Sequence, residues 1–174
     1  MGRKLVPVTM GSPEFFTLEL GPFRVSDARF PPSTVLAPHV HERPIVAVII
    51  EGSWEQRFTN SSHECVPSSV LVEPAEERHA NHFQQAGARV VVVEPDPARA
   101  ELFQPCAELL DSTACFRNNA VAAVANRVVR EMRHDDAAAP IAVEGLVLEL
   151  LAEATRAHLR GTCLLYTSPS PRDS

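Results

Sequence analysis

The apolar positions of the first hundred residues fall in short runs with a period of two. Each run is bounded by Gly, Pro, Asn or Ser, and the strands predicted in this way cover residues 15–20, 23–25, 45–51, 53–59, 70–72 and 89–94. Gly52 and the Asn60-Ser61-Ser62 cluster have the chemistry of turns. Prolines, which do not fit inside central strands, separate several of the runs. Many short strands with frequent turns indicate a β-sandwich or barrel.

After Pro105 the spacing of the apolar positions changes from two to about 3.6, which predicts a pair of helices. Asn118 or Asn119 is suited to cap the first helix, while Pro140 suits the first turn of the second helix and Gly161 its end. The apolar stripe of the first helix is predicted to contain Val121, Val124, Ala125, Val128, Val129 and Met132, and that of the second Val143, Leu146, Val147, Leu150, Leu151 and Ala154.

Two further apolar residues of the second helix, Ile141 and Leu148, lie beside its main stripe. This flank is either core beneath the barrel or a surface kept for another chain. Because the stripe is then wider than one packing partner requires, we expect the chain to form a homodimer through Ile141 and Leu148.

The composition is that of a single folded domain, with 174 residues of which 45% are hydrophobic and 22% charged. A formal charge of -6 argues against this chain gripping a nucleic-acid backbone by itself. No run approaches the roughly 18 apolar residues of a membrane span, and no signal peptide is recognisable. We therefore expect a cytoplasmic protein without a membrane partner. The four cysteines form no CxxC pair, so we expect buried or idle thiols.

The last stretch, residues 163–174, breaks the local patterns before it and resembles the translation of a sequencing adaptor. We interpret the native sequence as ending near Thr162, with the real protein continuing beyond it. The expected organisation is a β-barrel over residues 1–105, a helical linker and dimerisation region over 106–162, and a non-native tail over 163–174.

Three histidines carry the most informative chemistry. His39 and His41 are two apart, so on an extended strand both imidazoles reach the same face, and His79 follows some forty residues later. A third imidazole from a neighbouring strand would complete a set of three nitrogen ligands. Such a set suits one divalent metal, Zn, Ni, Fe or Mn, with positions left for water or a small molecule. The alternative is that the three histidines line the barrel without a metal.

The spacing of these residues resembles the two-motif signature of the cupins, which are small double-stranded β-helix (jelly-roll) barrels. The resemblance rests on His39-x-His41, Gly52 eleven residues later, and Pro74-x-x-x-x-His79. Segments 38–44, 50–53 and 74–83 look more specifically like the N-terminal sensor domain of bacterial AraC-type transcriptional regulators, and 130–132 and 144–146 look like the helices that follow it. The resemblance implies an α+β fold, a cupin-like barrel followed by an antiparallel helix pair.

Three positions depart from the cupin pattern. Ile45 stands where the first motif normally places a glutamate, so a metal site here would lack its carboxylate. Glu76 stands where the second motif has glycine, and Phe83 where it has asparagine. These departures weaken the enzymatic version of the site.

Two neighbours of the histidines are further candidates for ligand binding. Arg43 can clamp a carboxylate or phosphate of a ligand, although a surface arginine beside Glu42 is the commoner arrangement. Trp54 can stack on the ring of a ligand, or pack on the barrel wall.

The resemblance implies the sensing and dimerisation portion of an AraC-type regulator. A small-molecule effector would enter the barrel and alter how a missing C-terminal helix-turn-helix domain is presented to DNA. The rival is a stand-alone metal-dependent cupin enzyme of the dioxygenase or isomerase type, using His39, His41 and His79 around its metal. A third alternative is a cupin that stores a ligand or serves as a scaffold.

Overall fold

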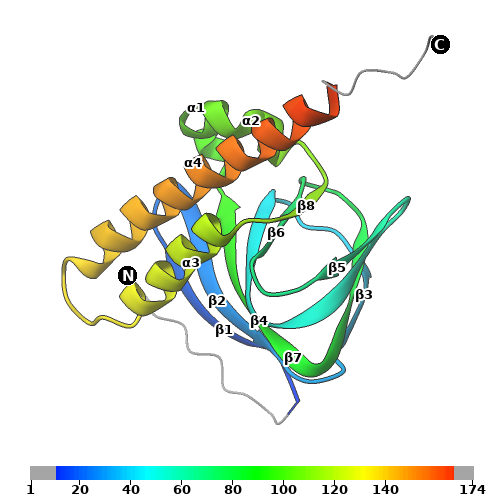
Figure 1. Ribbon diagram of the computed structural model, residues 1–174. Helices are drawn as coiled ribbons and strands as arrows, with labels where there is room; N and C mark the ends of the chain where they lie inside the picture. The colour runs from blue at the N-terminus through cyan, green and yellow to red at the C-terminus, as the bar shows by residue number, and fades with distance from the viewer. Residues whose placement is uncertain (1–10, 167–174) are drawn as a thin grey trace.

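Eight antiparallel strands curve around a common interior and form a jelly-roll barrel (Figure 1). The structure is a computed structural model that describes the backbone of residues 11–166 and the side chains of residues 11–161. The strands are β1 (Glu14–Glu19), β2 (Phe23–Phe30), β3 (Val35–His39), β4 (Ile45–Phe58), β5 (Ser62–Cys65), β6 (Ser69–Glu73), β7 (His79–Pro95) and β8 (Ala114–Arg117).

The long strands β4 and β7 pair with each other and run through the whole barrel. The order along the main sheet is β1-β2-β7-β4-β6-β8, while β3 pairs with the first part of β7 and β5 with the second part of β4. The strands β4 and β7 are both longer than the sequence predicts. β3, β5 and β8 are additional to the predicted strands, and β8, although it follows residue 105, pairs with β6.

The predicted turn at Gly52 is wrong, because β4 continues through this residue. The register between β4 and β7 shifts on both sides of Gly52, so the glycine forms a bulge within one bent strand. Its φ is 74°, and a Cβ there would lie 1.9 Å from the carbonyl oxygen of Gly87. The glycine allows the close approach of two bending strands. The predicted turn at 60–62 is confirmed, since Phe58 N–H donates to Ser61 O at 2.8 Å and β5 begins at Ser62.

Helices cover the outside of one wall of the barrel (Figure 1). The short helices α1 (Ala100–Phe103) and α2 (Ala107–Leu110) and the 3-10 turns η1 (Pro97–Arg99) and η2 (Gln104–Cys106) connect β7 to β8. They are followed by α3 (Asn119–Glu131) and α4 (Ala139–Tyr166). The Asn118 side chain accepts from Val121 N–H at 3.0 Å and caps α3, as predicted. Gly161 does not end the second helix, since α4 runs on to Tyr166.

The sheet therefore has two buried faces. On β4, Val46 and Val48 belong to the cluster shared with α3 and α4, whereas Ile45, Ala47 and Ile49 belong to the cluster inside the barrel. The predicted helical stripes pack into the first of these clusters. This arrangement explains why the central strands read as continuous apolar runs.

Outside these clusters, Ile141 is 76% exposed and Leu148 is 37% exposed, so neither belongs to the core of this chain. Of the cysteines with described side chains, Cys65 is buried and Cys106 and Cys115 are half-buried, all without disulfide bonds. Within the described residues no helix is long and apolar enough to cross a membrane. The side chains of the tail at 163–174, interpreted as adaptor-derived, lie outside the described residues.

Candidate functional site

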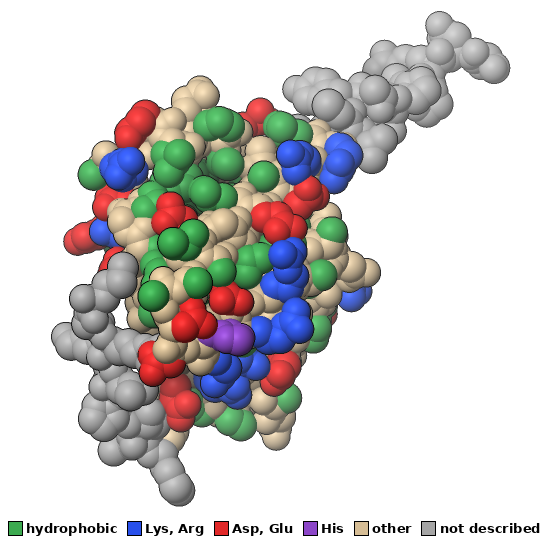
Figure 2. All heavy atoms as spheres, turned by 90° about the vertical axis from the view of Figure 1, so that its left-hand side faces the viewer, with side chains coloured by type: hydrophobic (Ala, Val, Ile, Leu, Met, Phe, Trp, Pro, Cys, Tyr) green, Lys and Arg blue, Asp and Glu red, His purple; other side chains and the backbone are tan. Residues whose placement is uncertain are grey.

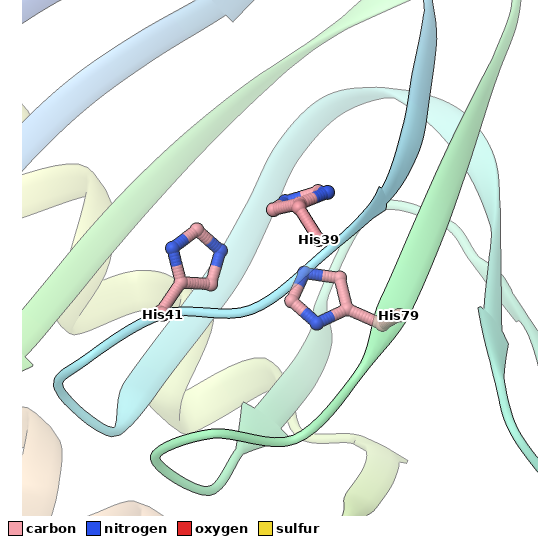
Figure 3. Close-up of side chains that lie close together, drawn as sticks. All are labelled: His39, His41 and His79. Atoms are coloured by element: carbon pink, nitrogen blue, oxygen red, sulfur yellow. The ribbon is translucent and has the colours of Figure 1, made fainter.

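The structure brings the three predicted histidines together inside the barrel (Figure 3). His39 is the last residue of β3 and pairs with His79, the first residue of β7, while His41 lies two residues beyond the end of β3. The ring centroids are 4.4 Å apart for His39 and His79 and 5.0 Å apart for the other two pairs. One ligand nitrogen from each ring lies within 4.8 Å of the others.

The turn before His79 holds this arrangement in place. Glu76 N–H donates to His41 O at 2.8 Å, which ties the loop after β3 to the turn between β6 and β7. Glu76, which stands where the cupin motif has glycine, has a φ of 62°. The backbone thus keeps the left-handed conformation that glycine favours, at a cost of about 1 kcal/mol for a residue with a Cβ.

Hydrogen bonds fix which nitrogen two of the rings present to the site. Nδ1 of His39 lies 2.7 Å from Ala37 O, and Nδ1 of His79 lies 3.0 Å from Glu77 O. Because a carbonyl oxygen only accepts, both Nδ1 atoms carry the proton and both Nε2 atoms keep a lone pair. Burial lowers the pKa of His79 to about 4 and also lowers that of His41. The rings of His41 and His79 are therefore neutral near pH 7, the form that binds a metal.

A buried carboxylate that the sequence analysis missed completes the cluster. Glu73, the last residue of β6, places Oε2 3.4 Å from Nε2 of His79 and 3.8 Å from Nε2 of His41. Its side chain is only 6% exposed. Burial raises the pKa of Glu73 to about 8, although a hydrogen bond from Gln56 opposes the shift. The available signal was a lone acidic residue at the end of the apolar run 70–72, directly before Pro74.

A directed chain of hydrogen bonds connects this carboxylate to the barrel wall. Trp54 Nε1–H donates to Oε1 of Gln56 at 3.0 Å, and Nε2 of Gln56 donates to Oε1 of Glu73 at 2.7 Å. Asn81 also donates to Oε1 of Gln56, and its own Oδ1 is buried without a hydrogen-bond partner. Since the indole N–H is a donor only, it sets the orientation of both amides.

The histidines and Glu73 line a cavity of about 840 Å³ inside the barrel. Phe30 and Phe83 stack in its wall with centroids 4.3 Å apart, and Trp54 packs on Phe83 at 5.2 Å. Trp54 is 3% exposed, so it is a wall residue whose N–H is already bonded within the protein. The volume is that of a small-molecule site, lined by aromatic and aliphatic groups with a few polar ones.

The arginine that lines this cavity is Arg24, whereas the sequence predicted Arg43. Arg43 is not among the residues that line the cavity, and its guanidinium lies 3.8 Å from the carboxylate of Asp96. Arg24 of β2 does line it, and bonds through two guanidinium nitrogens to Glu94 of β7. No local sequence pattern marks Arg24, because its access to the cavity depends on the pairing of β2 with β7.

An antiparallel jelly-roll barrel with three imidazoles converging in its interior defines a cupin-like protein. The chain belongs to the family of AraC-like ligand binding domains, whose model matches residues 20–151. This match includes the three histidines, Glu73 and both long helices as far as residue 151.

Comparison with solved structures gives several partial likenesses. KdgF from Halomonas sp. is 18% identical, with a TM-score of 0.47 over 56% of this chain and 90% of its own. Oxalate decarboxylase of Bacillus subtilis is 16% identical, with a TM-score of 0.48 over 55% of this chain and 28% of its own. AerE from Microcystis aeruginosa is 12% identical, with a TM-score of 0.49 over 53% of this chain and 45% of its own. Likenesses of this size carry no information about what the chain binds. No curated protein matches the chain in sequence.

Proposed function

We propose that the chain is the ligand-sensing and dimerisation portion of a bacterial, cytoplasmic AraC-type transcriptional regulator, and that it is not an enzyme. The observation that carries the proposal is the cavity of about 840 Å³ in a chain of the AraC-like ligand binding family. A small-molecule effector binds in this cavity, its flat apolar part against the aromatic wall and its polar part at the histidines. DNA is contacted only through a C-terminal domain outside this sequence.

His39, His41 and His79 bind one divalent metal, Zn, Ni, Fe or Mn. The donor set fits this role, since three imidazole rings converge and two of them have Nδ1 hydrogen-bonded to a carbonyl oxygen. Donor atoms 2.1 Å from one ion lie at most about 4.2 Å apart, so the 4.8 Å cluster needs only small side-chain adjustments. When bound, the metal supplies a Lewis-acidic centre for an oxygen atom of the effector.

The sheet itself connects the cavity to the helices. Ile45 and Ala47 line the cavity, and the residues between and after them on β4, Val46 and Val48, pack against the helical layer. A ligand that displaces this wall therefore changes the packing of α3 and α4. The effector shifts the arrangement of the helices only by the difference between its affinities for the two arrangements.

The second candidate function is a stand-alone metal-dependent cupin enzyme. It is favoured by the same three imidazoles beside the buried carboxylate of Glu73. In that case a bound small molecule is converted to product, whereas a sensor releases its ligand unchanged.

A thermal-shift screen of small aromatic and carboxylate metabolites against the metal-loaded chain tests the proposal. A ligand at a hundred times its Kd stabilises the folded chain by about 2.7 kcal/mol, which raises Tm measurably. Ala47→Phe fills the cavity and should abolish the shift, while Val35→Phe, at an exposed site on β3, should retain it. Mass spectrometry then decides the class, because conversion of the ligand during incubation refutes the sensor proposal in favour of the enzyme.

A further inference from the structure

Glu73 lies directly opposite Ile45 in the pairing of β4 with β6. Directly opposed residues of an antiparallel pair have their side chains on the same face of the sheet. Ile45 and Glu73 both line the cavity. Ile45 occupies the place where the cupin motif has its glutamate, so a carboxylate from the neighbouring strand reaches the same region of the barrel.

The hydrogen bonds of the carboxylate leave one particular oxygen for the histidines. Oε1 of Glu73 accepts from Gln56, whose orientation is fixed by the donor-only indole of Trp54. Oε2 is the oxygen that lies 3.4 Å from His79 and 3.8 Å from His41. Gln56 is fully buried and Trp54 nearly so, which holds this orientation inside the wall.

Oε2 of Glu73 and Nε2 of His79 are both atoms that can bind a metal ion. Nε2 of His79 has a lone pair, because its Nδ1 donates to Glu77 O. A carboxyl oxygen and a bare ring nitrogen attract each other only through a cation between them, which is a proton in the metal-free chain and a metal ion when one binds. Oε2 of Glu73 and the two Nε2 atoms that lie within 3.8 Å of it are ligand atoms of the kind that a divalent metal binds.

We propose that Glu73 is a direct ligand of the metal held by His39, His41 and His79, so that β6 supplies the carboxylate missing from β4. The inference rests on the metal binding proposed above and adds its fourth protein ligand. Three neutral imidazoles and one carboxylate leave a net charge of one on the bound dication. The site therefore attracts an effector that presents an anionic oxygen to it. Gln56 is a positioning residue that acts through Glu73.

Metal titration of the chain purified without an affinity tag and stripped with a chelator tests the assignment. Co²⁺ reports the ligand set through its visible spectrum, and competition with a chromophoric chelator gives the Kd for Zn²⁺. Glu73→Gln keeps the size of the side chain and should weaken Zn²⁺ binding about 100-fold and shift the Co²⁺ bands. Glu73→Asp, which retains an oxygen donor, should bind with intermediate affinity. Glu64→Gln, at an exposed position on β5, is the matched control and should behave as the unsubstituted chain.

The outcomes separate this inference from the proposal on which it rests. If the unsubstituted chain binds no metal, the three-histidine site itself is refuted. If it binds metal and Glu73→Gln leaves the Co²⁺ spectrum unchanged, Glu73 is not a ligand, even where the affinity falls. Infrared difference spectra of the unsubstituted chain give the same decision without any variant. Metal addition should shift the carboxylate or carboxylic-acid bands of a buried side chain, and unchanged bands overturn the assignment.

Discussion

Gly52 and Gly87 lie next to each other where β4 and β7 bend, and the absence of a Cβ at each residue allows the two strands to follow this path. A Cβ on Gly52 would lie 1.9 Å from Gly87 O, and one on Gly87 would lie 2.4 Å from Phe30 O. Both residues also have positive φ. The bend brings the first half of β7, with His79, alongside the end of β3, with which it pairs. The geometry of the histidine cluster therefore depends on these two glycines.

Gly52→Ala should destabilise the chain by about 3 kcal/mol, because left-handed strain adds to a backbone clash that no side-chain rotation relieves. Gly21→Ala is the matched control, since Gly21 has a similar φ of 68° but no atom within 4 Å of the added Cβ. It should cost about 1 kcal/mol, the strain alone. Urea unfolding measures both changes, and equal losses would show that the clash plays no part.

The histidines could be predicted from the sequence, whereas Glu73 could not. The spacing of His39 and His41 is a local pattern that places two rings on one side of an extended segment. The position of Glu73 depends on which residue of β6 faces Ile45, and nothing local to either strand gives that register. The same reason hid Arg24 and left Arg43 as the more visible candidate.

The strands and helices differ in how well their patterns predict them. The polar faces of α3 and α4 contact solvent, so their 3.6-residue period is clear, and both helices begin close to the predicted caps. The central strands are buried on both faces and lack such a period. The first half of β7 alternates correctly, but its buried residues include His79 and Asn81, so a search for apolar alternation passes over it.

An ion-pair cluster fastens the helical layer to the barrel. Asp27 of β2, with a side chain 3% exposed, accepts two hydrogen bonds of 2.8 Å from Arg89 of β7. Arg133, just after α3, donates to the same carboxylate at 2.9 Å. Burial raises the pKa of Asp27, but the hydrogen bonds and charge of Arg89 outweigh it, so the net pKa lies below the usual value.

Asp27→Asn should destabilise the chain by about 3 kcal/mol at pH 7, because it leaves Arg89 without its partner in a largely buried place. A carboxyl with a depressed folded pKa stabilises the protein above its unfolded pKa, about 3.9, and loses this contribution as the pH falls through the folded value. The difference between the two proteins should therefore narrow below about pH 4. Denaturant unfolding from pH 7 to pH 3 measures it.

Two further variants separate the parts of this cluster. Arg133→Gln removes a mostly exposed partner and should cost about 1 kcal/mol or less. Glu51→Gln, whose exposed carboxylate lies 3.9 Å from Arg89, should leave the pH profile unchanged. A pH-independent loss in Asp27→Asn would contradict the depressed pKa.

At the scale of the whole chain, the barrel and the other helices leave one face of α4 exposed. The face of the molecule in Figure 2 shows hydrophobic side chains between charged ones. Among the residues of α4 with described side chains, the exposed large apolar ones are Ile141, Leu148 and Leu159. Their spacing of seven and eleven residues places them on one side of the helix. Gly145 lies between the first two with nothing within 4 Å of its missing side chain, so this side is open to a close-packed partner.

The width of the apolar stripe predicted this flank, but the sequence alone left open whether the barrel or another chain would cover it. The barrel does not cover this flank. Ile141 and Leu148 are exposed, because the opposite side of α4 packs against the sheet. An association of two copies through α4 has a purpose in a regulator, since a symmetric dimer places two DNA-reading domains on successive half-sites.

Leu148→Glu should convert a dimer to a monomer, because it places a charge in the centre of this face while the core stripe of α4 stays intact. Sedimentation of the chain truncated at Thr162, at tens of micromolar, measures the change. Val35→Glu, an exposed apolar position on β3, is the control and should remain dimeric. Circular dichroism should show the same folded barrel in both variants. A monomer before any substitution would refute dimerisation through α4.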